Sequence, residues 1–277
     1  MSSKSMSLKA KIRNYAKKSK IAAQAVLQNY MFEKFLARLS ASEYKDNFVI
    51  KGGMLIAAVV GLDTRSTMDL DTTLRGLPVT KERIYTAIES ICKVALNDEV
   101  DFHIVSIEAI RENDLYDGYR VRIDAVYDAM STHLSVDIST GDVITPDAIQ
   151  YEIGGMFDEE QRIRLWGYNM ETVLAEKVET ILSRGVFSTR PRDFYDVYII
   201  AKTQKYSRAV FEEALTATSN HRGTAENIAD RAGILSRIIE SNELKGMWEK
   251  YQNRFSYAKE IQYGDIMKVL NNLLGLI

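Results

Sequence analysis

The sequence predicts an α+β fold in which a mixed sheet with flanking helices is followed by a helical C-terminal region. Short segments that run apolar or alternate between apolar and polar residues, as strands do, are concentrated before Pro146. From residue 169 onward the apolar residues mostly recur at helical spacing, after one strand-like segment at 162–166. A chain of 277 residues is long enough for one or two domains. We therefore expect an α/β domain over 1–150 and a mainly helical domain over 151–277.

Composition limits the possible classes of protein. Apolar residues make up 46% of the chain and charged residues 27%, as in ordinary globular proteins, and a net charge of -2 creates no overall attraction to nucleic acid. One cysteine excludes an internal disulfide and fits a reducing compartment. The longest apolar run, nine residues from Met54 to Leu62, is far shorter than the ~20 residues that span a bilayer. We expect a cytoplasmic protein with no membrane partner.

The N-terminal part of the chain is helical in pattern and strongly basic. Apolar residues recur at helical spacing within 7–38, and residues 1–32 contain seven lysines and arginines and no acidic residue. A basic helix of this kind could contact RNA phosphates. It could also present a solvated face whose charge is balanced by acids elsewhere in the fold. Both interpretations remain open.

The first half contains a series of expected strands and helices. A short apolar strand at 47–50 leads into Gly52-Gly53, and the buried helix that follows ends at Gly61. A strand is expected next, at 68–74. A helix that Thr80 caps comes after it. Three further strands are expected at 102–107, 119–127 and 133–139, and the middle one alternates as a strand with one wet face does.

Asp69 and Asp71 are the leading candidates for metal ligands. On a strand, residues two apart share one face and lie about 6–7 Å apart. Two carboxylates at that separation repel each other unless a cation lies between them. Mg²⁺ prefers oxygen ligands and leaves coordination positions for phosphates. A solvated strand face gives the same spacing, so this interpretation stays open beside the metal clamp.

Two further features strengthen the metal interpretation. Gly52 and Gly53 stand where a helix begins, and the N–H groups there attract anions while glycine allows a phosphate to approach closely. A tight turn is the alternative reading of the glycines. Asp137 lies on a later strand, and if that strand pairs with the one bearing Asp69 and Asp71, three carboxylates can surround two cations. Two such cations clamp the attacking and leaving oxygens in a displacement at phosphorus.

The second half carries its own group of charged residues. Lys177 lies inside an apolar helical stripe and therefore needs a partner. Asp193 and Asp196 are three apart on the next helix, so they share a face. One interpretation is that Lys177 pairs with these acids as a structural link between two helices. The other is that Lys177, Arg184 and Arg192 bind a nucleoside triphosphate, and the two are compatible.

The order of these motifs resembles a known family. A glycine pair, an Asp-x-Asp flanked by apolar residues and a separate later Asp are typical of polymerase-β-like nucleotidyltransferases. The further pairing of KGGMLIAAVVGLDTRSTMDLD with EKVETILSRG and RPRDFYDVY, over roughly 47–200, resembles the AbiEii/AbiGii-type nucleotidyltransferase toxins of bacterial type IV toxin–antitoxin, abortive-infection systems. The resemblance adds Lys51 of the Lys-Gly-Gly motif and Ser66 of the Arg-Ser-Thr motif as nucleotide-binding candidates.

The resemblance implies a polymerase-β-like core, an NTP substrate, Mg²⁺ or Mn²⁺ as cofactor, and phage defence through growth arrest. In characterised relatives the acceptor is the end of tRNA, so RNA, and tRNA above all, is the expected partner. An antitoxin encoded alongside is also implied, and it need not bind the toxin.

The expected reaction is attack by an acceptor hydroxyl on the α-phosphate of the NTP, with pyrophosphate leaving. We expect particular residues to bind the metals, bind the phosphates, accept the proton and orient Lys177. These are Asp69, Asp71 and Asp137 for the metals, Gly52-Gly53, Arg65 and Lys177 for the triphosphate, Asp137 for the proton, and Asp193 for orienting Lys177. Two rival functions remain: phosphoryl transfer at the same metal site, and a nucleotide- or RNA-binding module whose acids are only structural.

Overall fold

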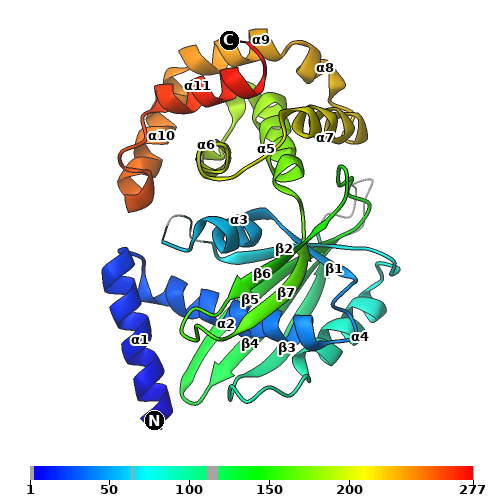
Figure 1. Cartoon of the computed structure of the whole chain (residues 1–277), viewed down its shortest axis with the longest axis vertical. Helices are drawn as coiled ribbons and strands as arrows, with labels where there is room; N and C mark the ends of the chain where they lie inside the picture. Colours follow the sequence, from blue (N-terminus) through cyan, green and yellow to red (C-terminus); the bar gives the residue numbers. More distant parts are fainter. Residues whose placement is uncertain (1–2, 64, 66, 111–117, 277) are drawn as a thin grey trace. The chain divides into compact units, whose positions relative to one another are not determined.

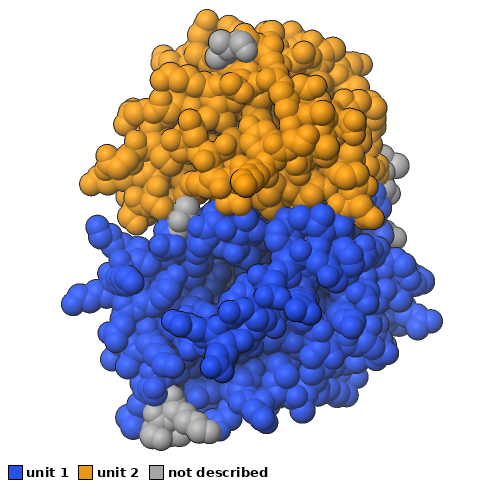
Figure 2. Space-filling view, in the orientation of Figure 1, with its two compact units in different colours: residues 1–142, 148–167 blue, residues 143–147, 168–277 orange. Residues whose placement is uncertain are grey.

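The computed structural model describes residues 3–63, 65, 67–110 and 118–276, which form two compact units (Figures 1 and 2). The first unit comprises Met1–Asp142 and Ala148–Gly167, and the second comprises Val143–Asp147 and Tyr168–Ile277. The first unit extends past the expected boundary at residue 150 because a strand pair from the later half joins its sheet.

A mixed seven-stranded sheet forms the framework of the first unit, with the strand order β3-β4-β5-β2-β1-β7-β6. β2 pairs in parallel with β5, and β1 pairs in parallel with β7, while the other neighbours are antiparallel. The strands are β1 (Phe48–Lys51), β2 (Asp69–Leu74), β3 (Asp101–Ala109), β4 (Tyr119–Tyr127), β5 (Met130–Ser139), β6 (Ile149–Gly154) and β7 (Arg162–Gly167). All of these were expected near their observed positions except β6.

β6 is absent from the sequence expectation because it lies at the edge of the sheet. An edge strand needs no buried face along its whole length, and the side chain of Ile149 is indeed exposed. Its partner β7 has the alternating burial of a strand with one face inward, which is why its pattern could be recognised.

Four helices belong to the first unit: α1 (Ser3–Ser19), α2 (Ala23–Ala41), α3 (Gly52–Val60) and α4 (Lys81–Cys92). The single helical stretch expected over 7–38 is therefore two helices. The chain breaks at Lys20, which adopts a φ of 58° in the left-handed region. α1 packs along α2 and buries Leu8, Ile12 and Ala16, which follow helical spacing.

The two faces of the sheet have different environments. On one face, Phe102 of β3 contacts Phe35 of α2, with 5.8 Å between ring centroids. Phe102 is in register with Ala125 of β4, and Leu70 of β2, which is fully buried, points to the same face through its register with Val136 of β5. Because side chains alternate along a strand, Asp69 and Asp71 on either side of Leu70 point to the opposite face.

The second unit is helical. Pro191 occupies the first turn of its helix, as the sequence predicts. The α-helices are α5 (Met170–Arg184), α6 (Pro191–Thr203), α7 (Arg208–His221), α8 (Ala225–Ala229), α9 (Arg231–Glu240), α10 (Asn242–Arg254) and α11 (Tyr263–Leu273), and the 3-10 turns are η1 (Gly185–Phe187) and η2 (Ser256–Ala258). α5 packs against both α6 and α7, so it is the element that organises the side chains considered below.

Candidate active site

Three carboxylates lie on one face of the central strands. β2 and β5 pair in parallel, with Asp71 directly opposite Asp137 and Asp69 opposite Ser135. Side chains at paired positions share a face, and so do residues two apart on one strand, so Asp69, Asp71 and Asp137 point to the same side of the sheet. The pairing of these two strands, which the sequence left conditional, is therefore present.

A guanidinium group holds the third carboxylate. Arg120 of β4 lies opposite Asp137 and donates from Nε and Nη2 to its two carboxylate oxygens, at 2.8 and 2.7 Å. The hydrogen bond and then the charge of Asp137 raise the pKa of Arg120, and the charges of Asp69 and Asp71 raise it further. All three acids thus act on one cation. Within the described residues, no cluster of three or more Asp, Glu, His or Cys side chains is close enough to hold a metal as it stands.

The glycine pair begins α3, as the sequence predicts, and each glycine touches a predicted site residue. Gly52 has a φ of +61°, and a Cβ there would overlap the Oδ2 atom of Asp71. A Cβ on Gly53 would lie 2.8 Å from both Arg65 Nη1 and Thr67 Oγ1. Arg65 is only 1% exposed, so its charge lies beneath the start of the helix. Glycine is required here because side chains already fill the space around the turn.

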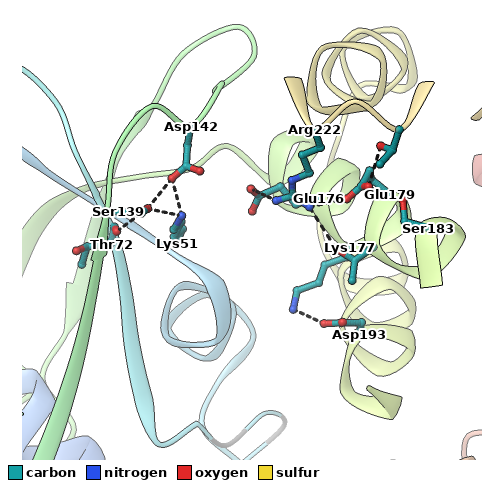
Figure 3. Close-up of polar contacts among 12 residues, drawn as sticks. Lys51, Thr72, Ser139, Asp142, Glu176, Lys177, Glu179, Ser183, Asp193 and Arg222 are labelled. Carbon is teal, nitrogen blue, oxygen red and sulfur yellow. Dashed lines mark hydrogen bonds and ion pairs between the residues drawn. The ribbon is translucent and has the colours of Figure 1, made fainter. Parts of the chain in front are cut away.

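Lys51, the residue before the glycine pair, contacts two residues that the sequence did not single out. Its Nζ lies 2.8 Å from Ser139 Oγ and 2.5 Å from Asp142 Oδ2 (Figure 3). Burial alone would raise the pKa of Asp142, but the charge and hydrogen bond of Lys51, with hydrogen bonds from Ser139 and Thr73, lower it. The available signal was the position of Ser139 and Asp142, at and just beyond the end of the strand that carries Asp137.

In the second unit, Lys177 of α5 bridges two carboxylates of α6. Its Nζ lies 2.5 Å from Asp193 Oδ1, as Figure 3 shows. The same Nζ lies 3.1 Å from Asp196 Oδ2. The Asp193 and Asp196 side chains are 6% and 0% exposed, whereas Lys177 is 19% exposed. The structural link expected between the two helices is therefore present. Asp193 Oδ2 is buried and has no hydrogen-bond partner in the described part of the chain, so the aspartate keeps unused acceptor capacity.

A second charged link joins α5 to α7, and sequence reasoning did not identify it. Arg222 donates to Glu176 at 2.7 Å and to Glu179 at 2.5 Å, as Figure 3 shows. Glu179 is buried and also accepts from Ser183 and Thr224. This cluster satisfies the hydrogen-bonding capacity of Glu179 internally, so we assign it to the fold.

The remaining candidates differ in their surroundings. Arg184 ends α5, and Arg192 lies exposed in the first turn of α6. Neither guanidinium forms a hydrogen bond or ion pair within the described residues, so both are available to an anion. Ser66 lies outside the described residues. None of the described helices is both long and apolar enough to cross a membrane.

The basic N-terminal segment is not neutralised by ion pairs. In the described part of the molecule, its cations between positions 9 and 20 form no ion pair, and most of them are exposed. They are Lys9, Lys11, Arg13, Lys17, Lys18 and Lys20. Among the described residues, acids elsewhere in the fold therefore do not pair directly with these cations.

Comparison with known proteins identifies the family of the chain. A family model described as the nucleotidyl transferase AbiEii toxin of type IV toxin–antitoxin systems matches residues 34–269. The chain belongs to the AbiEii nucleotidyltransferase toxin family. The match spans the glycine pair, the acids of β2 and β5, and the α5–α6 motif, so the resemblance seen in the sequence is confirmed. AbiEii membership makes the protein a nucleotidyltransferase toxin and implies a nucleotide substrate and an antitoxin.

Two solved structures share this AbiEii fold. JHP933 from Helicobacter pylori aligns with a TM-score of 0.50 at 14% identity, covering 92% of this chain and 94% of that one. A protein from H. pylori assigned as a nucleotidyltransferase aligns with a TM-score of 0.50 at 16% identity, covering 93% and 99% of the two chains. At these identities the likeness concerns the fold, which confirms the α+β nucleotidyltransferase architecture. No curated protein matches the chain.

Proposed function

We propose that this AbiEii-family toxin transfers a nucleoside monophosphate from an NTP to a hydroxyl of RNA, with Mg²⁺ or Mn²⁺ bound by Asp69, Asp71 and Asp137. The tRNA 3′ acceptor end is the substrate that the family resemblance favours. The observation that carries the proposal is the common face of the three carboxylates, whose charges all act on Arg120.

The donor set fits a divalent cation. Carboxylate oxygens are the ligands that Mg²⁺ and Mn²⁺ prefer. Arg120 is a stand-in cation that satisfies Asp137 through two hydrogen bonds. The guanidinium uses one lone pair of each Asp137 oxygen, so its positive charge opposes a metal that binds the same carboxylate. When bound, the metal would supply Lewis-acid polarisation of the phosphate and neutralisation of its charge.

The chain's own residues would handle the reacting groups. The acceptor oxygen forms a bond to the α-phosphorus, and the bond from that phosphorus to the bridging oxygen breaks, releasing pyrophosphate. Asp137 would accept the hydroxyl proton. The N-terminus of α3 at Gly52-Gly53 would receive the triphosphate, with the buried charge of Arg65 beneath it. Lys51 would exchange Asp142 for a phosphate oxygen.

The second unit carries further cations that suit a triphosphate. We propose that Lys177, Arg184 and Arg192 bind phosphate oxygens, with Asp193 orienting Lys177. The ion pair at 2.5 Å supports the orienting role, since it fixes the position of Lys177 Nζ. Arginine suits this purpose because its planar fork matches phosphate geometry.

RNA as the acceptor is supported by α1. A polyanion that gains contacts with lysine and arginine side chains releases its counterions, which makes binding favourable. Leu8, Ile12 and Ala16 of α1 are already buried and Met6 is an isolated exposed apolar residue, so mostly charged surface remains for a partner. A free apolar face, which a membrane-surface helix needs, is therefore missing from the described part of α1.

The experiment that tests the proposal is transfer of label from each α-³²P NTP to total bacterial tRNA, with Mg²⁺, by the wild type and by Asp71→Ala. We expect label on tRNA from the wild type and none from the variant. Asp101→Ala is the matched control, because Asp101 is an exposed acid at the start of β3.

Other outcomes would assign a different function. Label from γ-³²P NTP in place of α-³²P NTP would indicate phosphoryl transfer. Full activity of a folded Asp71→Ala protein would exclude the metal role of the acids. An active enzyme that labels some other RNA would leave nucleotidyl transfer intact and replace only the acceptor.

A further inference from the structure

Phe187 is the most exposed large apolar side chain in the described part of the protein, at 86%. It ends η1, the short turn between α5 and α6. Burying a phenylalanine is worth about 1.5–3 kcal/mol, so a fully exposed ring forgoes that stabilisation. Isolated exposed apolar residues are common on protein surfaces, however, and the ring alone does not indicate a ligand.

The charges around Phe187 provide a second, independent observation. Arg184, Arg190 and Arg192 flank it within nine residues, and no guanidinium of the three forms a hydrogen bond or ion pair with the described residues. The other arginines of this unit all hold a partner in the chain. Those arginines are Arg208, Arg222, Arg231, Arg237 and Arg254. Partnerless cations are therefore concentrated in the segment that carries the exposed ring, and Arg184 lines the same cavity as Phe187.

A cavity of about 390 Å³ adjoins Phe187. Leu182 and Ile234 supply apolar lining, while Arg184 and Asn227 supply polar groups. Glu226 adds a carboxylate that can accept a hydrogen bond from an exocyclic amino group. This volume lies within the range typical of small-molecule sites, about 300–1,000 Å³. A flat apolar ring, free cations and a partly polar cavity thus occur together.

We propose that Phe187 and the adjoining cavity form a binding site for an unpaired nucleobase, with Arg190 contacting the phosphate of the same nucleotide or its neighbour. Every base has a π-face, so stacking on an aromatic side chain tolerates any sequence. Arg190 lies three residues from Phe187, at most about 11 Å along an extended chain, which is within reach of an adjacent phosphate. A base inside a duplex is already stacked on its neighbours, so the site selects single-stranded nucleotides.

The inference deepens the proposed function, on which it rests for the choice of ligand class. An unpaired base could come from the NTP or from the single-stranded end of an RNA acceptor. Both sources present the same stacking chemistry, and the test below separates them without using catalysis.

The first measurement is the fluorescence of Phe187→Trp during titration with ligand. The probes are a short single-stranded RNA, a blunt-ended RNA hairpin of equal length, and each NTP, all without added metal. Stacking of a base on the introduced indole should quench its emission. The wild type gives the background from Trp166 and Trp248, and Tyr85→Trp places an indole at a half-exposed position on α4 as a matched control.

The second measurement is binding affinity for the single-stranded probe. Phe187→Ala should weaken binding by about 5- to 150-fold, whereas Phe187→Tyr should retain it. Arg190→Gln should lower the slope of log affinity against log salt by about 0.7, the value for one lost single-strand phosphate contact. Arg83→Gln is the matched control, because Arg83 is an exposed arginine of α4 without a side-chain partner among the described residues.

The outcomes assign the site or reject it. Stronger quenching by single-stranded RNA than by the hairpin supports the proposal and assigns the base to RNA. Quenching by an NTP but not by RNA also supports the proposal and assigns the base to the nucleotide. No quenching by either source, or equal quenching by the hairpin, overturns it. If the fluorescence of Phe187→Trp is quenched but the wild type labels no RNA, the transfer reaction alone is rejected. If the wild type labels RNA but the fluorescence of Phe187→Trp is not quenched, this site alone is rejected.

Discussion

Arg120 and Asp137 form a two-point ion pair that occupies the third carboxylate of the candidate metal site. The two strands that carry them are antiparallel neighbours, and the residues are directly opposite in register. Both oxygens of Asp137 accept from Arg120, at 2.8 and 2.7 Å. The protein therefore neutralises Asp137 with its own cation, and an incoming cation at that carboxylate competes with the pair.

Arg120→Gln should strengthen divalent-metal binding. The substitution removes the competing charge, and the partly exposed pair is worth about 1 kcal/mol or less, so we expect up to about a 5-fold lower Kd for Mn²⁺. Electron paramagnetic resonance of free Mn²⁺ during titration measures this directly. Arg122→Gln is the control, since Arg122 lies on the same strand and pairs with Glu108 instead. A Mn²⁺ affinity that does not rise in Arg120→Gln would show that Arg120 does not compete with the metal.

Gly52→Ala should cost both stability and activity. Its φ of +61° strains any L-residue by about 1–2 kcal/mol, and the new Cβ would displace the Asp71 carboxylate. We expect a loss of activity of about 100-fold or more, because a misplaced catalytic group costs that much. Nucleotide transfer and urea unfolding measure the two effects.

Gly76→Ala separates strain from displacement. Gly76 has a similar φ of +71°, but the nearest atom to a new Cβ is Asn47 Nδ2 at 3.8 Å, so only the strain remains. We expect it to lose about 1–2 kcal/mol of stability and to keep its activity. Equal activity losses in the two variants would mean that the effect of Gly52 is general destabilisation.

Short-range patterns predicted the elements that carry the site. Asp69 and Asp71 share a face because of the two-residue period of a strand, and the helix at Gly52-Gly53 was predicted from the continuous apolar run that follows and ends at Gly61. These features depend on a few adjacent residues. The pairing of β2 with β5 could not be predicted from these short patterns. From the sequence, the shared face of the three acids could be stated only on the condition that the two strands pair.

The partners of Lys177 were predicted, but those of Arg120 and Lys51 could not be. Arg120 was visible only as one residue on the wet face of a strand, and its pairing with Asp137 depends on register between strands 17 positions apart in sequence. The contact between Lys51 and Asp142 joins residues 91 positions apart. Likewise, the helix break at Lys20 falls inside a segment whose apolar residues repeat at helical spacing. A lysine does not indicate a left-handed φ, so the break was not predicted. Long-range contacts, which periodicity does not encode, decide the pairings of Arg120 and Lys51.

Lys177→Met should strongly destabilise the second unit. It leaves Asp193 and Asp196 buried without their cation, and breaking a buried pair in this way costs about 3–5 kcal/mol. Urea unfolding measures the loss, with Lys202→Met as the control, because Lys202 is an exposed lysine of α6, the helix that carries the two acids. An unfolding free energy equal to that of the wild type would contradict the structural link.

Lys177→Arg separates the structural role from the proposed role in phosphate binding. Arginine keeps the charge, so most of the stability should remain. Its guanidinium cannot reproduce the position of a lysine Nζ, so nucleotide transfer should fall. A variant that keeps both stability and activity would assign Lys177 to the fold alone.

The Lys51–Asp142 pair should make stability depend on pH on the acid side. The pKa of Asp142 is lowered in the folded state, so its contribution is present above the unfolded pKa, about 3.9, and is lost as pH falls through the folded value. Urea unfolding of the wild type and of Asp142→Asn between pH 7 and pH 2 should differ by about 1–2 kcal/mol at neutral pH and converge in acid. A difference that stays constant with pH would mean that the charge of Asp142 does not contribute.

The basic face of α1 should appear in the salt dependence of RNA binding. Lys11, Lys17 and Lys18 are exposed and form no ion pair within the described residues, so replacing all three with glutamine leaves the buried side of α1 unchanged. Each lost phosphate contact lowers the slope of log affinity against log salt by about 0.7 for a single strand and 0.9 for a duplex, so the triple variant should lose about 2. Fluorescence anisotropy of labelled tRNA between 50 and 200 mM salt measures the slope.

The control for α1 is a second triple variant, Lys45→Gln, Lys81→Gln and Arg83→Gln, which removes the same charge from exposed positions elsewhere in the first unit. A general effect of net charge would lower affinity equally in both triple variants, whereas a docking surface on α1 lowers the slope only in the first. Equal slopes in the two variants would assign the α1 charges to solvation and would leave RNA binding to the arginines of the second unit.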